Sequence, residues 1–141
     1  MEYLTKFDKL LKNLIVLAII ATAVGLFFPM TSTSFGPYYG SIAKHIAQTN
    51  DWTDLVLSNQ DWLDKPHFPF WISALSFKIF GINSFAYILP GFLFHLLGAV
   101  YTYRLSNLLY KNNAVSLLAT LIYLSIFHLM FSLKFFNNFL L

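Results

Sequence analysis

The chain has 141 residues, no cysteine and few charged side chains. Without cysteine it can form no disulfide, thiolate metal site or cysteine nucleophile. Charged residues make up 11% of the sequence, whereas an average soluble domain has about a quarter. The net charge of +3 is small and scattered, with no basic stripe of the kind that binds nucleic acid. Nucleic acid is therefore not an expected partner.

The residues that are abundant are apolar and aromatic. Hydrophobic residues make up 57% of the chain and aromatic residues 19%, including 16 Phe and 8 Tyr. A soluble domain of this size cannot bury so much apolar surface, so lipid is the expected solvent. The composition therefore predicts an all-α membrane protein.

Three long apolar stretches predict transmembrane helices at 14–30, 85–103 and 114–133. A helix needs about 20 apolar residues to cross a hydrocarbon core of ~30 Å, and the first stretch is at the short end of that range. A signal peptide cleaved after the segment 21–23, Ala-Thr-Ala, is the alternative for the first stretch. An uncleaved span is the preferred interpretation.

The segment 31–81 between the first two spans contains the long polar part of the sequence. Apolar residues at helical spacing predict an amphipathic helix at about 38–49. A second helix is predicted at 69–81, because proline begins it and glycine ends it. At 1.5 Å per residue this second helix is too short to cross a bilayer. Both helices are therefore expected to lie at the membrane surface, within an outer loop.

The basic residues give a weak signal for orientation. An arrangement with the N-terminus in the cytoplasm places slightly more of them inside than outside, and those inside are Lys6, Lys9, Lys12, Arg104 and Lys111. Cytoplasmic segments of membrane proteins carry an excess of Lys and Arg. We therefore expect a cytoplasmic N-terminus and an outer loop on the opposite side.

Charged and aromatic residues concentrate in "DWLDKPHFPFW", residues 61–71. Asp64 and Lys65 form a charged pair directly before Pro66, which biases Lys65 towards an extended backbone. At the headgroup level a lysine can contact a lipid phosphate, and an aspartate can bind a divalent metal. A structural ion pair, or a lysine that reaches for water, is the alternative. Two earlier acids of the loop, Asp51 and Asp54, are interpreted as solvated.

Three stretches of the sequence resemble the opening part of the GT-C class of membrane glycosyltransferases. They are "YYGSIAKHIAQTNDW" from Tyr38, "WLDKPHFPFWISALSFKIFGINSFAYILPGFL" from Trp62 and "YTYRLSNLLYKNNAVSLLATLIY" from Tyr101. The resemblance is to the bacterial branch that includes dolichyl-phosphate-mannose-protein mannosyltransferases and lipid A aminoarabinose transferases. It implies a bacterial inner-membrane location and a sugar donor carried on polyprenyl phosphate.

The resemblance also implies roles for individual residues. Lys65 matches the lysine that lies near the carrier phosphate, and Asp64 matches the acid of the same motif, which sometimes accompanies a divalent metal. His67 stands where a second proline is usual in the family, and its alternatives are polar or metal support and a plain surface histidine at a turn. A cation beside a phosphate leaving group stabilises the charge that develops there.

One family feature is missing from the sequence. The position that matches the aspartate of the first outer loop is Phe35, and residues 31–50 contain no acid at all. The resemblance implies that this aspartate acts as a base, and phenylalanine cannot accept a proton, so no catalytic residue can be carried over. We therefore expect a truncated and inactive N-terminal fragment of such an enzyme. The alternatives are a non-enzymatic membrane protein or subunit that binds carrier lipid, and a small membrane protein that shares only the hydropathy.

His95 lies near the middle of the second predicted span. An ionisable group inside a membrane is a functional candidate by default. The alternative is a neutral histidine bonded to a neighbouring helix, and that interpretation is preferred.

Overall fold

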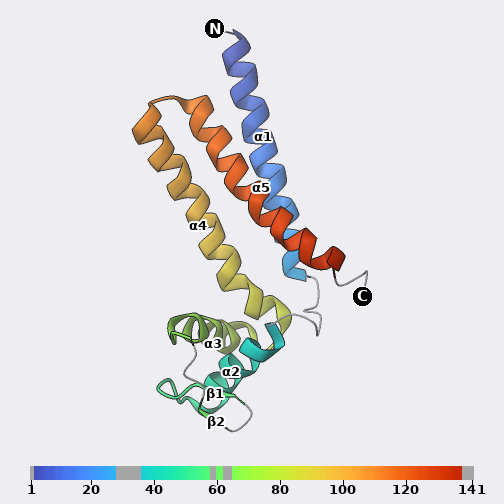
Figure 1. Cartoon of the computed structure of the whole chain (residues 1–141), viewed down its shortest axis with the longest axis vertical. Helices are drawn as coiled ribbons and strands as arrows, with labels where there is room; N and C mark the ends of the chain where they lie inside the picture. The colour runs from blue at the N-terminus through green and yellow to red at the C-terminus, as the bar shows by residue number, and fades with distance from the viewer. Residues whose placement is uncertain (1, 28–35, 58–59, 62–64, 138–141) are drawn as a thin grey trace. The chain divides into compact units, whose positions relative to one another are not determined.

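The computed structural model describes residues 2–27, 36–57, 60–61 and 65–137. Within these ranges the chain is mainly helical, as Figure 1 shows. In chain order the elements are α1 (Glu2–Val24), η1 (Gly25–Phe27), α2 (Gly36–Thr49), β1 (Val56–Leu57), β2 (Gln60–Asp61), α3 (Phe68–Phe80), α4 (Ser84–Tyr110) and α5 (Asn113–Asn137). The chain divides into two compact units: residues 1–25 with 93–141, and residues 26–92.

Helices occupy each of the three predicted spans. Two of them, Thr5–Phe27 and Ser84–Tyr110, are long and apolar enough to cross a membrane among the described residues. Many of their apolar side chains are exposed, such as Leu17 at 61%, which suits a lipid solvent. α5 covers the third predicted span, but Asn113–Ile126 counts as a shorter apolar helix. That three helices cross the membrane therefore stays a prediction.

The spans predicted at 85–103 and 114–133 leave residues 104–113 between them as a short polar turn, and this expectation is wrong. α4 continues to Tyr110, and the connection to α5 consists of Lys111 and Asn112. Most residues of this extension, such as Arg104 and Leu105, are good helix formers, so the helix has no local reason to stop. It ends at Lys111, which has a positive φ of 50°, and Asn112 accepts hydrogen bonds from the first amides of α5.

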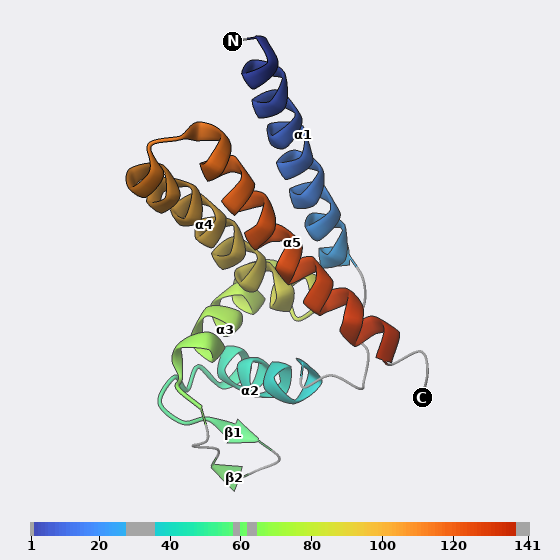
Figure 2. The same cartoon turned by 45° about the horizontal axis from the view of Figure 1, so that its top comes forward.

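In the unit of residues 1–25 and 93–141, α1 packs along α5 (Figure 2). Leu11 of α1 is buried, as are Leu117 and Leu124 of α5. α5 also buries Ser116 and Thr120, whose hydroxyls donate to main-chain carbonyls one turn earlier at 2.8 Å. Small hydroxyl residues allow helices to approach closely, and their hydrogen bonds within the helix remove the cost of burying them.

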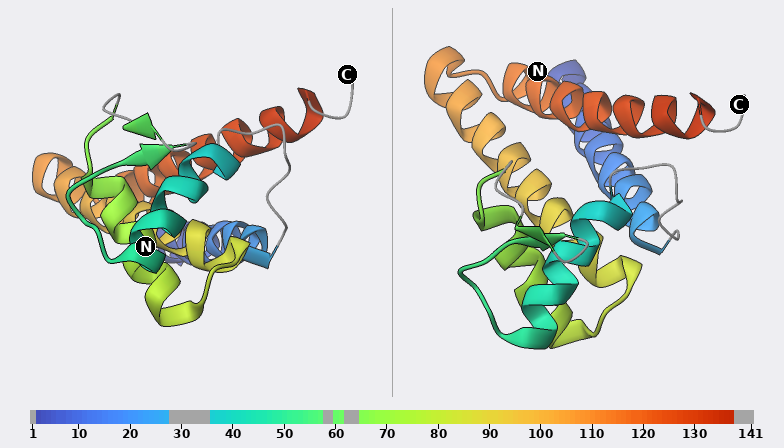
Figure 3. Two further views of the ribbon diagram at one scale, coloured as in Figure 1. Left: turned by 90° about the horizontal axis from the view of Figure 1, so that it is seen from below. Right: turned by 60° about the horizontal axis from the view of Figure 1, so that its bottom comes forward.

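In the unit of residues 26–92, α2 and α3 lie side by side (Figure 3). Both helices agree with the sequence prediction to within two residues at each end. The antiparallel pair of β1 and β2 joins Val56 to Asp61 and was not predicted, because two-residue strands have too short a pattern to recognise. The regular secondary structure of the described residues thus consists of helices and this one short hairpin.

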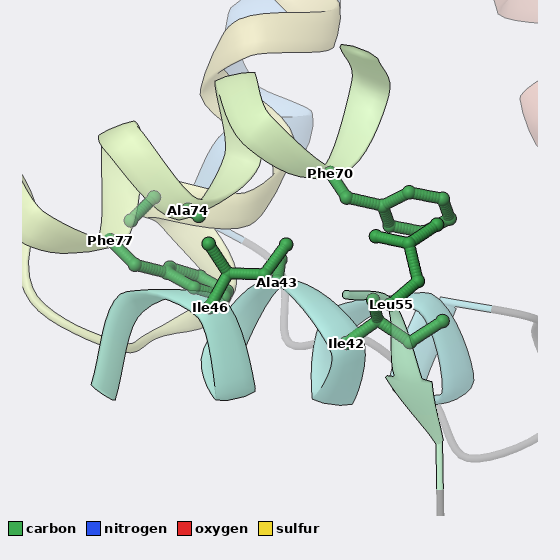
Figure 4. Packing of buried hydrophobic residues seen from close by; sticks show 8 residues of the cluster. Ile42, Ala43, Ile46, Leu55, Phe70, Ala74 and Phe77 are labelled. Atoms are coloured by element: carbon green, nitrogen blue, oxygen red, sulfur yellow. The ribbon is translucent and has the colours of Figure 1, made fainter. Parts of the chain in front are cut away.

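The core of this unit forms between α2 and α3. Figure 4 shows Ile42, Ala43 and Ile46 of α2 pointing toward α3. They pack against Phe70, Ala74 and Phe77 of α3 and against Leu55 of the following segment, and all seven side chains are at most 5% exposed. Burying apolar area is worth about 25 cal/mol per Å², so this cluster is the main force that fixes α2 on α3.

Candidate functional site

The predicted carrier-binding lysine lies in the turn before α3. Lys65 is exposed, and Asp64 falls outside the described residues. Pro66 follows Lys65, and Pro69 stands in the first turn of α3. Proline fixes its own φ and restricts the residue before it, so the backbone that carries Lys65 has few accessible conformations. The chain therefore presents an exposed ammonium group from a stiff turn.

His67 secures this turn to the preceding loop. Its Nε2 lies 3.0 Å from the carbonyl oxygen of Thr53, and because a carbonyl can only accept, Nε2 carries the donated proton. Its ring also lies 5.7 Å from the ring of Trp71. These contacts occupy Nε2, which leaves Nδ1 as the nitrogen with a lone pair. No group of three or more His, Asp or Glu that could hold a metal occurs among the described residues.

Two further residues of α3 hold the same loop. Trp71 Nε1 donates to the carbonyl oxygen of Trp52 at 2.7 Å. Lys78 donates to the side-chain oxygen of Asn50, and its ammonium lies 5.2 Å from the centre of the Trp52 ring. Such a cation–π contact is worth about 0.5–1 kcal/mol at an exposed site. We call residues 50–54 the tethered loop, because His67, Trp71 and Lys78 attach it to α3.

Asp51 shapes the tethered loop from within. Its Oδ1 accepts the Thr53 hydroxyl at 2.7 Å, the Thr53 amide at 3.0 Å and the Asp54 amide at 3.3 Å. These hydrogen bonds, the one from the Thr53 hydroxyl first, lower the pKa of the Asp51 carboxyl below its usual value. A carboxylate with a lowered pKa and three donors serves as a turn-forming group and is a poor general base.

The sequence reasoning missed the tethering residues. Asn50, Trp52, Trp71 and Lys78 looked like loop and helix-surface positions, and their contacts join residues 19 and 28 positions apart. The sequence contains only a weak signal for these contacts. Two of its three tryptophans, Trp62 and Trp71, stand on either side of the Asp64–Lys65 pair. Pairing at such separations depends on how α2 and α3 pack, and no local pattern encodes it.

The second candidate, His95, lies within the other unit. Its ring is stacked on that of Tyr123 of α5, with centroids 5.0 Å apart and planes 22° apart. A Cβ placed on Gly98, one turn further along α4, would meet Cζ of the same tyrosine at 2.8 Å. His95 thus contacts a neighbouring helix through its ring, and the neutral, bonded state stays a prediction.

The site as a whole combines an exposed cation with a tethered loop. Among residues 36–57 the acids are Asp51 and Asp54, and Asp51 is engaged in the turn. The exposed ammonium group of Lys65 suits the binding of an anion. Phe35, which matches the family's aspartate, lies outside the described residues.

Comparison with known proteins gives one family and a set of relatives. Residues 64–141, more than half of the chain, match the family model described as dolichyl-phosphate-mannose-protein mannosyltransferase. The chain is 34% identical over 88 residues to an undecaprenyl phosphate-alpha-4-amino-4-deoxy-L-arabinose arabinosyl transferase of Wigglesworthia glossinidia brevipalpis. It is 36% identical over 87 residues to a protein of the same name from Yersinia pestis (strain Pestoides F).

Each of these matches covers 62% of the chain and 16% of the relative. The matched part is therefore a small share of each curated relative. No solved structure matches the chain.

Proposed function

The chain belongs to the dolichyl-phosphate-mannose-protein mannosyltransferase family, and we propose that it is part of a membrane glycosyltransferase whose donor sugar is carried on polyprenyl phosphate. The family match begins at Asp64 and takes in Lys65, α3, α4 and α5. The relatives are named as transferases that use undecaprenyl phosphate-linked aminoarabinose. A carrier of the same chemical class, a polyprenyl phosphate, is therefore the proposed ligand of this chain.

In the proposed reaction an acceptor hydroxyl attacks the sugar carbon that is bonded to phosphate. The new bond joins that carbon to the acceptor oxygen, and the bond to the phosphate oxygen breaks. The hydroxyl proton must leave to a base, and the departing phosphate gains negative charge. A preorganised cation next to that phosphate lowers the barrier, because it stabilises charge that grows in the transition state.

We assign the phosphate contact to Lys65. The exposure of its side chain on a proline-stiffened turn is the observation that carries this assignment. Asp64 is proposed as polar or metal support beside it. His67, whose Nε2 donates to Thr53, is proposed to support the turn. The tethered loop then limits the movement of the turn relative to α3, and the ammonium group is held ready for the phosphate.

The proposed membrane location follows from the proposed polyprenyl-phosphate donor. A polyprenyl-phosphate donor resides in a bilayer, so we propose the bacterial inner membrane, with a cytoplasmic N-terminus and residues 31–81 on the outer side. We further propose that these 141 residues bind the carrier without transferring the sugar. The support for this is the absence of any acid in residues 31–50 of the sequence.

Binding of polyprenyl phosphate to the purified chain in lipid tests the assignment. Lys65→Ala removes one ammonium–phosphate contact, worth about 1–3 kcal/mol, so affinity is expected to fall by about five- to 150-fold. Lys44→Ala is the matched control, because it removes another exposed lysine of the same unit and is expected to change affinity little. Equal affinities of Lys65→Ala and the parent chain would refute the role of Lys65.

A further inference from the structure

Three helix ends meet at a polar cluster in the unit of residues 1–25 and 93–141. Asn113, at the start of α5, donates through Nδ2 to the carboxylate of Asp8 on α1. Its side-chain oxygen accepts the hydroxyl of Tyr103 on α4 at 2.9 Å. All three side chains are half-buried. The amide of Asn113 therefore holds α1, α4 and α5 together at the end of the unit where α4 and α5 are connected (Figure 1).

Exposed cations adjoin every member of this cluster. Lys9 follows Asp8, Arg104 follows Tyr103, and Lys111 precedes Asn113 by two positions; these three side chains are exposed, as is that of Lys12. Lys12 is four positions from Asp8 and so shares its face of α1. Arg104 lies in the last two turns of α4, and Lys111 directly follows the end of that helix, where its amide donates to the carbonyl oxygen of Asn107.

Little negative charge opposes these cations. The acids of residues 1–25 and 93–141 are Glu2 and Asp8, and Asp8 accepts the hydrogen bond from Asn113. Exposed tyrosines, Tyr101 and Tyr110, lie on the same part of α4. Tyrosines with an apolar ring and a polar hydroxyl concentrate at the headgroup level of membranes. Their presence here suits a position where the ends of apolar helices meet the phosphate layer.

We propose that Lys9, Lys12, Arg104 and Lys111 form a binding surface for the phosphate headgroup of an anionic phospholipid. Each lysine supplies a point charge, and the guanidinium of Arg104 supplies a planar fork that bonds two phosphate oxygens at once. Basic surfaces between membrane helices bind anionic headgroups in this way. The surface belongs to the unit that lacks Lys65, and the inference does not depend on sugar transfer.

The enrichment of an anionic lipid next to the surface can be measured directly. Asn107 is exposed and lies between Arg104 and Lys111 on α4, and the chain has no cysteine. Asn107→Cys therefore accepts a single bimane label, whose fluorescence is quenched by nearby bromine. The labelled chain is placed in phosphatidylcholine vesicles in which a tenth of the lipid is either dibrominated phosphatidylglycerol or dibrominated phosphatidylcholine. Quenching by the brominated phosphatidylglycerol is expected to be about threefold stronger or more.

The variants and the salt dependence decide the outcome. Lys9→Gln/Arg104→Gln/Lys111→Gln is expected to bring the quenching ratio close to one, whereas Lys44→Gln in the other unit leaves it unchanged. The parent chain gives an independent test, because 1 M NaCl shortens the screening length to about 3 Å. High salt should therefore abolish the excess quenching by brominated phosphatidylglycerol. A ratio of one in the parent chain, an excess that survives in the triple variant, or an excess that survives 1 M NaCl would each overturn the proposal.

Discussion

Trp71 Nε1 lies 2.7 Å from the main-chain oxygen of Trp52 and donates a hydrogen bond to it. The two residues are 19 positions apart, so this bond attaches the tethered loop to α3 at one defined register. Trp71→Phe keeps an aromatic ring and removes the donor. We expect it to destabilise the unit by about 0.5–1.5 kcal/mol, the net worth of one hydrogen bond.

Hydrogen exchange of the Thr53 and Asp54 amides checks this expectation. Faster exchange at both amides in Trp71→Phe is the expected result, because the loop opens more often. Phe68→Leu is a control, since Phe68 lies on the same helix and is 55% exposed. Unchanged exchange in Trp71→Phe would show that the hydrogen bond does not hold the loop.

Gly98 should tolerate no side chain. A methyl group there would meet Cζ of Tyr123 at 2.8 Å and overlap its hydroxyl, so the ring would have to move away from His95. We expect Gly98→Ala to cost about 1–3 kcal/mol, as overpacking does. Gly91→Ala is the matched control: nothing lies within 4 Å of its Cβ position, and alanine favours helices over glycine by about 1 kcal/mol.

Thermal unfolding in detergent, followed by helical circular dichroism, separates the two glycine variants. Gly98→Ala should melt lower than the parent chain, and Gly91→Ala should melt at the same temperature or higher. Adding Tyr123→Ala should remove most of the penalty of Gly98→Ala, because it removes the overlapping ring. A Gly98→Ala chain as stable as the parent would contradict the packing of the Tyr123 ring against Gly98.

Asp51 predicts a specific dependence of stability on pH. The folded chain lowers the pKa of this carboxyl from 3.8, so the folded state favours the ionised form. The contribution of this carboxylate to the free energy of unfolding is complete above pH 3.8, and it is lost as the pH falls through the lower pKa of the folded state. Comparing unfolding of the parent chain and Asp51→Asn between neutral pH and about pH 2 measures it. The difference between the free energies of unfolding of the two chains should shrink in acid. A difference independent of pH would refute the stabilising role of the Asp51 carboxylate.

Membrane orientation can be tested with the same cysteine-free background. We expect Gln60 outside and Asn107 in the cytoplasm. Both side chains are exposed, so Gln60→Cys and Asn107→Cys should each react with a thiol reagent once the membrane is permeabilised. In intact cells an impermeant reagent should label Gln60→Cys and spare Asn107→Cys. The reverse pattern would invert the proposed orientation.

The chain is expected to show no sugar transfer by itself. Transfer needs a base for the acceptor hydroxyl, and residues 31–50 contain no carboxylate. The measurement is transfer of a labelled sugar from a polyprenyl-phosphate donor by the purified 141 residues in lipid. Turnover above a protein-free reaction, lost in Asp64→Ala, would show that the chain is an enzyme.

Sequence patterns predicted the helices well because each carries a local signal. Pro69 and Gly81 mark the ends of α3, and Asn50, with a positive φ of 61°, ends α2 where the sequence "TND" changes from helix to loop. α4 continues beyond the predicted end of its span at residue 103 because Arg104 and the leucines that follow favour helices. Asn83 and Asn112 each accept hydrogen bonds from helix-start amides, and asparagine at these positions is a capping signal present in the sequence.

The contacts that join distant segments could not be predicted. Lys78 could bond with many loop groups, and the choice of Asn50 depends on the packing of α2 against α3. In the same way, nothing local in the sequence joins Asn113 to Asp8 across 105 positions. Lys65 is predictable from the resemblance and the adjacent prolines, because the proposed phosphate contact needs only one exposed charge on a stiff turn.

The hydrogen bond between Asn113 and Asp8 also constrains the order of assembly during synthesis. α1 is made first, but its partner helix α5 begins only at Asn113, after the whole unit of residues 26–92 has been made. α4 and α5 are separated by two residues, so the chain entropy lost when they pair is small. α4 and α5 can thus pair as soon as they are made, whereas α1 has to wait in the bilayer, with its apolar face on lipid, until that pair arrives.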